Sequence, residues 1–137
     1  MGQKVNPHGL RVGVIKDWDS RWYARNDKVG DLIVEDYKIR KFLKKTLYSA
    51  GVPTIEIERD SNKVRIYIHC SRPGVVIGKG GAEIEKLQAQ VSKMIGKPVA
   101  LSIVEVRTPD TNAQLVAENI AGQLERRIGF RRAMKNA

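Results

Sequence analysis

The stretch PGVVIGKGGAEIEKL, Pro73 to Leu87, holds four glycines between a short apolar run and a helical pattern. Inside regular structure a glycine is less favourable than an alanine by roughly 0.5–1 kcal/mol, because its backbone loses more freedom on folding. We therefore expect such a cluster only where the backbone needs an unusual geometry or where another molecule approaches it closely. The question is which molecule that is.

Two nucleotide-binding loops have glycines at similar spacing, and neither matches this sequence. A dinucleotide-binding turn needs G-x-G-x-x-G after a strand. Gly78 and Gly80 fit this pattern, but Glu83 takes the third glycine position and would repel a pyrophosphate. A triphosphate-binding loop needs G-x-x-x-x-G-K-[ST]. Here the spacing from Gly74 to Gly78 is one residue short, and Gly80 replaces the hydroxyl residue that would hold magnesium.

A third pattern, the G-x-x-G loop that clamps single-stranded nucleic acid, fits better. Gly78 and Gly81 bracket the loop, Lys79 adds a cation, and we expect Ile77 and Ile84 to anchor its two sides in the core. A sugar-phosphate chain comes close only where no Cβ stands in the way, and N–H groups at the start of the following helix favour phosphate. Bases would then lie across the neighbouring strand and helix. The alternative is a tight turn with a purely structural purpose.

The composition also favours a polyanionic partner. Of 137 residues, 25 are Lys or Arg and 15 are Asp or Glu, which gives a net charge of +10 and an isoelectric point of about 9.9. Residues 1–16 contain three bases and residues 126–137 contain five, and neither end contains an acid. This balance is typical of proteins that bind nucleic acid or an acidic membrane surface. The alternative is a solvated surface that serves only solubility.

The N-terminal residues predict an arm followed by an aromatic cluster. Glycines and Pro7 within residues 1–16 indicate an extended segment that becomes ordered only where something holds it. Trp18, Trp22 and Tyr23 follow beside arginines. Such aromatic side chains can stack on bases, but packing in a satellite cluster is the more common outcome and is our prediction.

One helix and two strands are expected next. Apolar residues at helical spacing predict a helix that Asp36 caps and Gly51 stops. Residues 55–58 and 64–69 alternate as two strands, and the polar residues 60–63 predict the hairpin turn between them.

The second half adds a helix, a strand and a basic helical end. The helix after the glycine loop ends at Gly96, and a strand follows Pro98. Residues 108–111 carry turn and cap chemistry for a helix whose apolar stripe runs from 113 to 128, with a break at Gly129. Since Arg127, Arg131 and Lys135 are four apart, we expect one helical face to present three cations to a nucleic-acid strand.

Nothing in the sequence indicates an enzyme, a cofactor or a metal site. His69 and its neighbour Cys70 point to opposite faces of a strand and cannot form a nucleophile–base pair. Glu56 and Glu58 share a strand face, where neighbouring basic residues explain them better than catalysis does. The single cysteine excludes an internal disulfide, and no apolar run approaches the length of a membrane span.

The stretch from about Asp36 to Arg107 resembles a type II KH domain, in which the additional helix and strand come first. The resemblance implies an α+β fold with the order helix-strand-strand-helix-helix-strand and a three-stranded sheet packed on helices. The chain then divides into a basic arm with its aromatic cluster (1–35), the KH domain (36–107), and a C-terminal helix with a basic tail (108–137).

The flanking sequences narrow the resemblance. MGQKVNPHGLRVG at the start, SRPGVVIGKGG in the middle and QLERRIGFRRAMK near the end are similar to the family of bacterial ribosomal protein three of the small subunit. This resemblance implies a structural, cytoplasmic component of the small-subunit head. Such a protein binds 16S ribosomal RNA, lines the path by which messenger RNA enters, and neighbours ribosomal proteins ten and fourteen.

The resemblance also implies roles for individual residues. Those at the entrance of the messenger RNA channel, where structured message is opened, are Arg131, Arg132 and Lys135. Those of the arm that lie against ribosomal RNA are Gly2, Lys4 and Arg11. Further basic residues that we expect to face RNA are Arg72, Arg126 and Arg127.

Two departures from the family qualify these expectations. Gly80 stands where many members carry a lysine, which lowers the expected attraction of the loop for phosphate. The family continues into a second α/β domain beyond the position of Ala137, so we expect this chain to correspond to the first portion of such a protein. Two alternatives stay open, namely a free-standing KH regulator or assembly factor and, less favoured, a nucleotide-dependent enzyme that uses the sequence GVVIGKGG.

Overall fold

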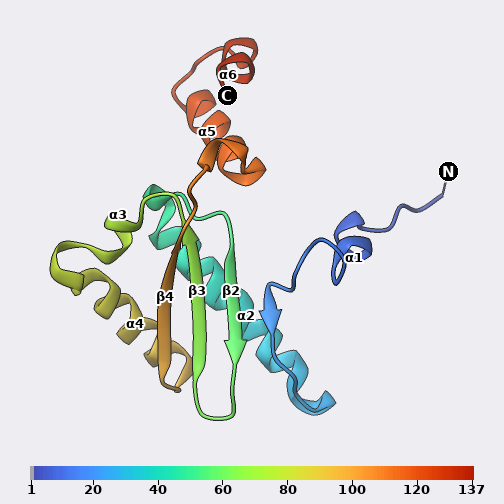
Figure 1. Ribbon diagram of the computed structural model, residues 1–137, viewed down its shortest axis with the longest axis vertical. Helices are drawn as coiled ribbons and strands as arrows, with labels where there is room; N and C mark the ends of the chain where they lie inside the picture. The colour runs from blue at the N-terminus through green and yellow to red at the C-terminus, as the bar shows by residue number, and fades with distance from the viewer. Residues whose placement is uncertain (1) are drawn as a thin grey trace.

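The three-dimensional structure is a computed structural model that describes residues 2–137; Met1, the first residue of the predicted arm, lies outside the described residues. Figure 1 shows the elements in chain order: α1 (Pro7–Arg11), β1 (Ser20–Arg21), α2 (Asn26–Thr46), η1 (Tyr48–Ala50), β2 (Ile55–Arg59), β3 (Val64–Cys70), α3 (Pro73–Ile77), η2 (Lys79–Gly81), α4 (Ala82–Ile95), β4 (Val99–Glu105), η3 (Pro109–Thr111), α5 (Ala113–Glu125) and α6 (Phe130–Asn136). Among residues 2–137, no helix combines the length and the apolar character that crossing a bilayer requires.

The sheet has the strand order β1-β2-β3-β4. β2 and β3 form the predicted antiparallel hairpin, whose turn is closed by the Asp60 N–H donating to the Lys63 carbonyl at 3.0 Å. β4 pairs parallel with β3, and β1 pairs parallel with β2. The three strands predicted for residues 36–107 are β2, β3 and β4. β1 adds a fourth strand from the segment before this range; it was not predicted, because two residues are too few to show an alternating pattern in the sequence.

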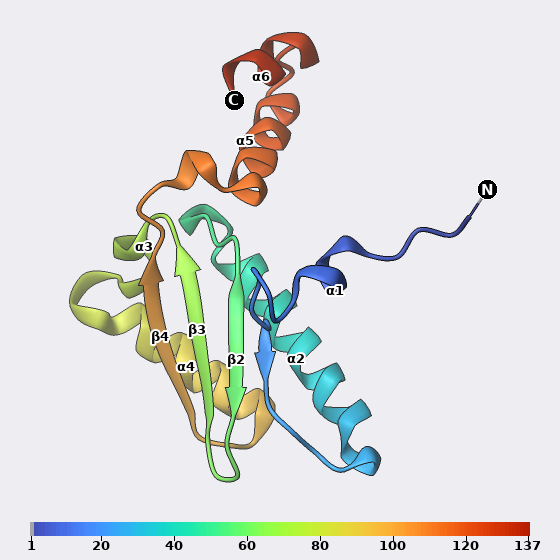
Figure 2. The same ribbon diagram turned by 45° about the vertical axis from the view of Figure 1, so that its right-hand side comes forward.

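Helices α2 and α4 cover one face of the sheet and leave the other open (Figures 1 and 2). The side chains between these layers are aliphatic and fully buried, among them Ile39, Leu43, Ile57, Ile66, Ile68 and Val91. Burial of each such side chain contributes roughly 1.5–3 kcal/mol to folding. The order α2, β2, β3, α3, α4, β4 confirms the predicted α+β arrangement of helix-strand-strand-helix-helix-strand.

Helix α2 begins at Asn26, well before the predicted start at Asp36. Asp36 is not a cap: it lies inside the helix, is 5% exposed, and accepts hydrogen bonds from Trp22 and Arg59. The predicted boundary after residue 35 therefore falls within the helix. The first turns of α2 were not predicted as helix, because they contain Gly30 and their apolar side chains stay exposed. Their apolar residues therefore do not form a stripe along one side of the helix. The predicted stop is near its place, since Gly51 adopts a left-handed conformation (φ 63°) just after η1.

The N-terminal arm is not extended throughout. The Asn6 side chain accepts a hydrogen bond from the His8 N–H and starts the short helix α1, which contains no buried residue. Of the aromatic cluster, Trp22 is half-buried, whereas Trp18 and Tyr23 are 62% and 92% exposed. The prediction of aromatic packing is thus right for Trp22 only.

The C-terminal helices differ from the prediction in their ends. The Asn112 side chain, one residue beyond the predicted cap region, accepts hydrogen bonds from the N–H groups of Gln114 and Leu115 and starts α5. α5 ends at Glu125, and Arg127 adopts a left-handed conformation (φ 62°) that breaks the helix before Gly129. Consequently Arg127 does not share a helical face with Arg131 and Lys135, and the predicted row of three cations is wrong.

Candidate nucleic-acid interface

The glycine loop connects α3 to α4 beside the β4 edge of the sheet (Figure 1). Three of its four residues have positive φ: Gly78 at 69°, Gly80 at 64° and Gly81 at 84°. The ψ of Gly78 is −172°, a combination that only glycine adopts readily. The cluster therefore meets a geometric requirement of the chain itself. It also leaves bare main chain at the surface, because a Cβ at Gly80 or Gly81 would meet nothing within 4 Å.

The loop begins a helix whose first turn has no side-chain cap. Gly81 is the N-cap of α4, and its missing side chain leaves the first N–H groups of the helix without a side-chain acceptor. Such groups attract phosphate, and the exposed Lys79 stands next to them. Glu83 and Glu85 lie in the same turn, and the Glu83 side chain packs against Gly78. The loop is consequently not strongly cationic, and its attraction for phosphate depends mainly on main-chain N–H groups.

The anchors of the loop differ from the predicted pair. Val76 is fully buried, whereas Ile77 is 41% exposed and Ile84 is half-buried. The prediction that Ile77 points into the core is wrong, because the short helix α3 turns Val76 inward instead. Ile77 and the 44% exposed Val75 remain available beside the loop as apolar contacts for bases.

The predicted entrance residues lie together on α6. Arg131, Arg132 and Lys135 are exposed and line one shallow hollow with Gly129, Phe130 and Asn136. The buried Ala133 fixes which side of this helix packs against the protein. Since α5 and α6 extend beyond the end of the sheet (Figures 1 and 2), these cations are displayed away from the main core.

The other basic candidates fall into two further regions. Arg72 and Arg126 line the same hollow between α5 and the end of β3, together with the carboxylates of Asp110, Glu118 and Glu125. Within this region, burial alone would raise the pKa of Glu118. Hydrogen bonds from Lys44 and Gln114, together with the charge of Lys44, outweigh burial, so the pKa of Glu118 is lowered overall. The arm residues Gly2, Lys4 and Arg11 are all exposed.

The structure does not bring these groups into one site. The arm projects beyond β1, the glycine loop lies beyond β4, and α6 lies above the end of the sheet (Figures 1 and 2). The arm, the glycine loop and α6 therefore form three separated regions, each able to contact a different segment of a nucleic acid, and the hollow lined by Arg72 and Arg126 is a fourth.

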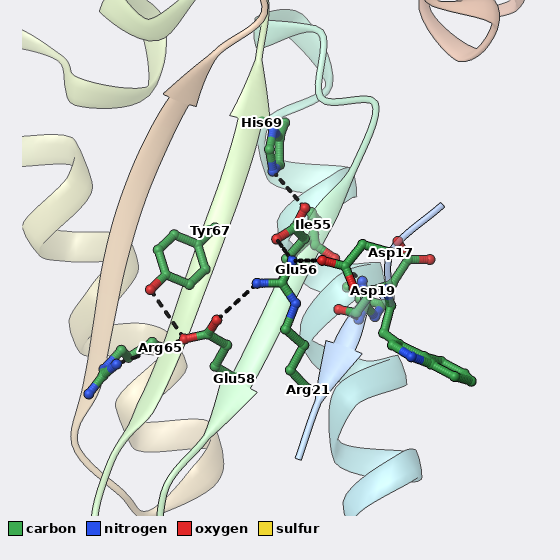
Figure 3. Close-up of polar contacts among 11 residues, drawn as sticks. Asp17, Asp19, Arg21, Ile55, Glu56, Glu58, Arg65, Tyr67 and His69 are labelled. Carbon is green, nitrogen blue, oxygen red and sulfur yellow. Dashed lines mark hydrogen bonds and ion pairs between the residues drawn. The ribbon is translucent and has the colours of Figure 1, made fainter. Parts of the chain in front are cut away.

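The open face of the sheet carries an ion-pair network that the sequence pattern alone did not predict (Figure 3). Arg21 of β1 contacts the carboxylates of Asp17 (2.7 Å), Glu56 (3.3 Å) and Glu58 (3.2 Å). Tyr67 donates to Glu58 at 3.2 Å. Partial desolvation lowers the pKa of Arg21, but the three carboxylates raise it overall. The strand alternation pointed to Glu56 and Glu58, but only the register with β1 reveals their partner.

Neither His69 nor Cys70 has the surroundings of a catalytic residue. The His69 Nε2 lies 3.1 Å from Glu56 on the open face, whereas Cys70 is fully buried on the other. Burial raises the pKa of the Cys70 thiol. A hydrogen bond from the Arg72 backbone lowers it and the negative charge of Glu105 raises it, so the overall direction is upward. Within residues 2–137, no group of three or more His, Cys, Asp or Glu side chains is placed to hold a metal ion.

Comparisons with known proteins agree with this geometry. Residues 38–111 match the family described as KH domain, a range that includes the hairpin, the glycine loop and β4. The chain is 66% identical over 99% of its length to small ribosomal subunit protein uS3 of Agathobacter rectalis, covering 62% of that protein. It is 65% identical over its whole length to the protein of the same name from Clostridioides difficile, covering 51% of it.

The chain thus spans about half to three fifths of the curated relatives that it matches. These relatives bear out the resemblance to bacterial ribosomal protein three that the flanking sequences indicated. The matched range, the element order and the glycine loop lead to one classification. This chain belongs to the KH domain family.

Proposed function

We propose that this chain is the KH-containing portion of a structural protein of the small ribosomal subunit, located with that subunit in the cytoplasm. The observation that carries the proposal is the similarity along the whole chain, basic ends included, to proteins named small ribosomal subunit protein uS3. A similarity limited to the KH domain would favour the free-standing regulator equally. The relatives' names describe ribosomal components, and in accordance with them the chain is not an enzyme.

Within this role, the three basic regions bind RNA. The arm residues Lys4 and Arg11 neutralise phosphates of 16S ribosomal RNA, and the loop from Gly78 to Gly81 holds an RNA backbone against the start of α4. Arg131, Arg132 and Lys135 stand at the entrance of the messenger RNA channel. The separation of the regions supports this division, since each can reach its own RNA segment. The expected protein neighbours are ribosomal proteins ten and fourteen.

Sedimentation distinguishes the ribosomal protein from a regulator. In a sucrose gradient of cell extract washed with high salt, we expect the protein to move with small subunits, because several separated phosphate contacts hold it together with its protein neighbours. Recovery at the top of the gradient after the wash would favour a diffusible regulator.

Equilibrium dialysis with labelled ATP, GTP and NAD tests the enzyme alternative, for which tight stoichiometric binding would be required.

The loop is tested by a double substitution, Lys79→Asp with Gly80→Asp. The fold should survive, because Lys79 is exposed, the Cβ at residue 80 meets open space, and aspartate tolerates a positive φ. Affinity for single-stranded RNA should fall, since two carboxylates then face the phosphates. The matched control is Lys97→Asp with Gln90→Asp, which changes the charge equally at exposed positions away from the loop. If the loop variant binds RNA at low salt as tightly as the unaltered chain, the proposal that the glycine loop binds an RNA backbone is wrong.

A further inference from the structure

A third hollow lies between the N-terminal arm and helix α2, toward the edge of the sheet opposite the glycine loop. It has a volume of about 670 Å³. His8 and Lys16 of the arm line one side, and Tyr37 and Lys41 of α2 line the other. We call it the arm–α2 hollow. Its volume lies within the range of about 300–1,000 Å³ that small-molecule and cofactor sites occupy.

Two cations of the hollow are free to bind a ligand. Arg40 is engaged, because it donates to the carbonyl oxygens of Asp19 (2.7 Å) and Ile55. Lys44 is engaged by the Val52 carbonyl and the Glu118 carboxylate. In contrast, Lys16 and Lys41 form no ion pair with any residue from 2 to 137. They stand on opposite sides of the hollow, one from each wall.

The carboxylates that line the hollow are mostly neutralised. Arg21 binds both Asp17 (2.7 Å) and Glu56 (3.3 Å), as Figure 3 shows. The Asp19 carboxylate forms no ion pair with a described residue and is the single lining acid without a cationic partner. The hollow therefore favours an anion near Lys16 and Lys41 and opposes one near Asp19.

An exposed aromatic ring completes the hollow. Tyr37 is 62% exposed, and the Lys41 Nζ lies 5.7 Å from the centre of its ring. This ring contributes little to the core, because the buried side of α2 is formed by Asp36, Ile39 and Leu43. An aromatic face stacks on any base, and an exposed cation–π contact is weak enough for Lys41 to turn toward a phosphate.

We infer that the arm–α2 hollow binds a nucleotide of a single-stranded RNA segment, with Tyr37 stacking on the base and Lys16 and Lys41 holding the flanking phosphates. The inference rests on the proposed RNA-binding function and adds a site separate from the glycine loop. An aromatic ring that shares one hollow with two cations free of ion pairs suits the alternation of bases and phosphates along a strand. The carboxylates of an acidic protein surface could pair with Lys16 and Lys41, but they would offer no base to stack on the Tyr37 ring.

The test measures binding of a fluorescent oligouridine of about ten nucleotides to the full chain by anisotropy. Tyr37→Ala should weaken binding about tenfold, and Tyr37→Phe should keep it, because stacking needs only the ring. Lys16→Gln and Lys41→Gln should each weaken binding and lower the slope of log affinity against log salt by about 0.7. Asp19→Asn should tighten binding, which a merely structural role of the hollow does not predict.

Matched controls are Tyr23→Ala and Lys28→Gln, an exposed tyrosine and an exposed lysine outside the hollow, which should bind as the unaltered chain does. Ultraviolet crosslinking followed by mass spectrometry should place uracil on Tyr37, also in the loop variant Lys79→Asp with Gly80→Asp. Excess uridine monophosphate should leave this crosslink in place. Loss of the Tyr37 crosslink in excess uridine monophosphate would indicate a site for free nucleotides and would overturn the inference.

The outcomes separate this inference from the proposed function. If the unaltered chain does not bind RNA at low salt, both the proposed function and the inference about the arm–α2 hollow are wrong. If the chain binds RNA and the loop variant is weakened while Tyr37→Ala binds normally, the glycine loop stands and the arm–α2 hollow is not an RNA site. A circular-dichroism melt of Tyr37→Ala and Tyr37→Phe verifies that any loss of binding is not a loss of folding.

Discussion

At the scale of single residues, Gly78 is the position where the backbone most requires glycine. Its φ of 69° and ψ of −172° lie in a region essentially closed to other residues. A Cβ there would also lie 2.6 Å from the Glu83 Cγ and 2.9 Å from its Cβ. Gly80 differs, because its φ of 64° and ψ of 18° are left-handed helical and its surroundings are open. The two glycines should therefore respond differently to substitution.

We expect Gly78→Ala to lower the free energy of unfolding by about 1–3 kcal/mol, from backbone strain and the contact with Glu83. Gly80→Asn should lower it by less than about 1 kcal/mol, because asparagine enters the left-handed region at little cost. Urea denaturation of both variants measures the difference. Equal losses would mean that the loop relaxes around either side chain.

The sequence predicted this loop well because its signal is local. Glycine spacing, Lys79 and the acids after the loop are all read within ten residues. Single positions such as Glu83 and Gly80 were enough to exclude the two nucleotide-binding loops. The orientation of Ile77 could not be predicted in the same way. Whether Val76 or Ile77 points inward depends on the one-turn helix α3, which follows from packing rather than from spacing.

At the scale of elements, a buried ion pair fastens β1 and β2 to α2. The Arg59 guanidinium contacts Asp36 at 2.6 Å, and both side chains are less than 10% exposed. Asp36 also accepts hydrogen bonds from Ser20 (3.1 Å) and Trp22 (2.8 Å). All the partners of this carboxylate are therefore supplied by the protein. Removing it leaves the buried Arg59 guanidinium with Glu35 (2.9 Å) as its remaining ion-pair partner and takes the acceptor away from the indole N–H of the half-buried Trp22.

Asp36→Ala should lower the free energy of unfolding by about 1.5–3 kcal/mol, the usual contribution of hydrogen bonds to a charged group, since Arg59 keeps its ion pair with Glu35. Asp36→Asn should cost less, because its side-chain oxygen still accepts from Trp22. Tryptophan fluorescence during urea unfolding reports the change, since Trp22 loses its partner and becomes more accessible. Asp31→Ala, at an exposed position of the same helix without an ion-pair partner among residues 2–137, is the control and should unfold like the unaltered chain.

This network also explains why the sequence placed the domain boundary inside α2. Strand β1 and the first turns of α2 are held by side chains far apart in sequence, such as Asp36 and Arg59, and not by a local apolar period. The hairpin and α4 carry their own periodicity and were predicted correctly. Elements fixed by long-range polar contacts are invisible to a pattern of hydrophobic residues.

Helix α5 is joined to α2 by a contact that depends on pH. The Lys44 Nζ lies 2.8 Å from the Glu118 carboxylate, and the net shift of the Glu118 pKa is downward from 4.5. A lowered pKa in the folded state means that the contact stabilises above the unfolded value and is lost as the pH falls through the folded value. The attachment of α5 should accordingly weaken only in acid.

We expect Glu118→Gln to be less stable than the unaltered chain near neutral pH. The difference should shrink as the pH falls from about 4.5 through the lowered pKa of Glu118, where that carboxylate takes up a proton and becomes uncharged like glutamine. Thermal melts across this range, with amide hydrogen exchange in α5, measure the effect. The control is Glu125→Gln on the same helix, which changes an exposed carboxylate that has no ion-pair partner among residues 2–137.

At the scale of the whole molecule, the net charge of +10 is distributed to the ends and edges of the fold. The open sheet face pairs its own charges through Arg21, Glu56 and Glu58, so it adds little to attraction for RNA. The arm and α6, which project away from the sheet, keep their cations unpaired among residues 2–137 (Figure 1). This distribution suits the proposed function, in which several RNA segments bind around a neutral core rather than one segment in a single cleft.

The α6 cations allow a test of this arrangement in an assembled ribosome. Replacing Arg131, Arg132 and Lys135 by alanine should slow translation of messages with a stable hairpin more than of unstructured ones, because fewer cations then hold the strand while a duplex opens. Replacing the exposed lysines at 28, 93 and 97 removes the same charge elsewhere and should affect both messages alike. Because Ala133 fixes the packed side of α6 and none of the three cations is buried, the triple variant should assemble normally. Equal slowing of both messages by the α6 variant would show that these cations contribute to RNA binding in general and not to opening the message.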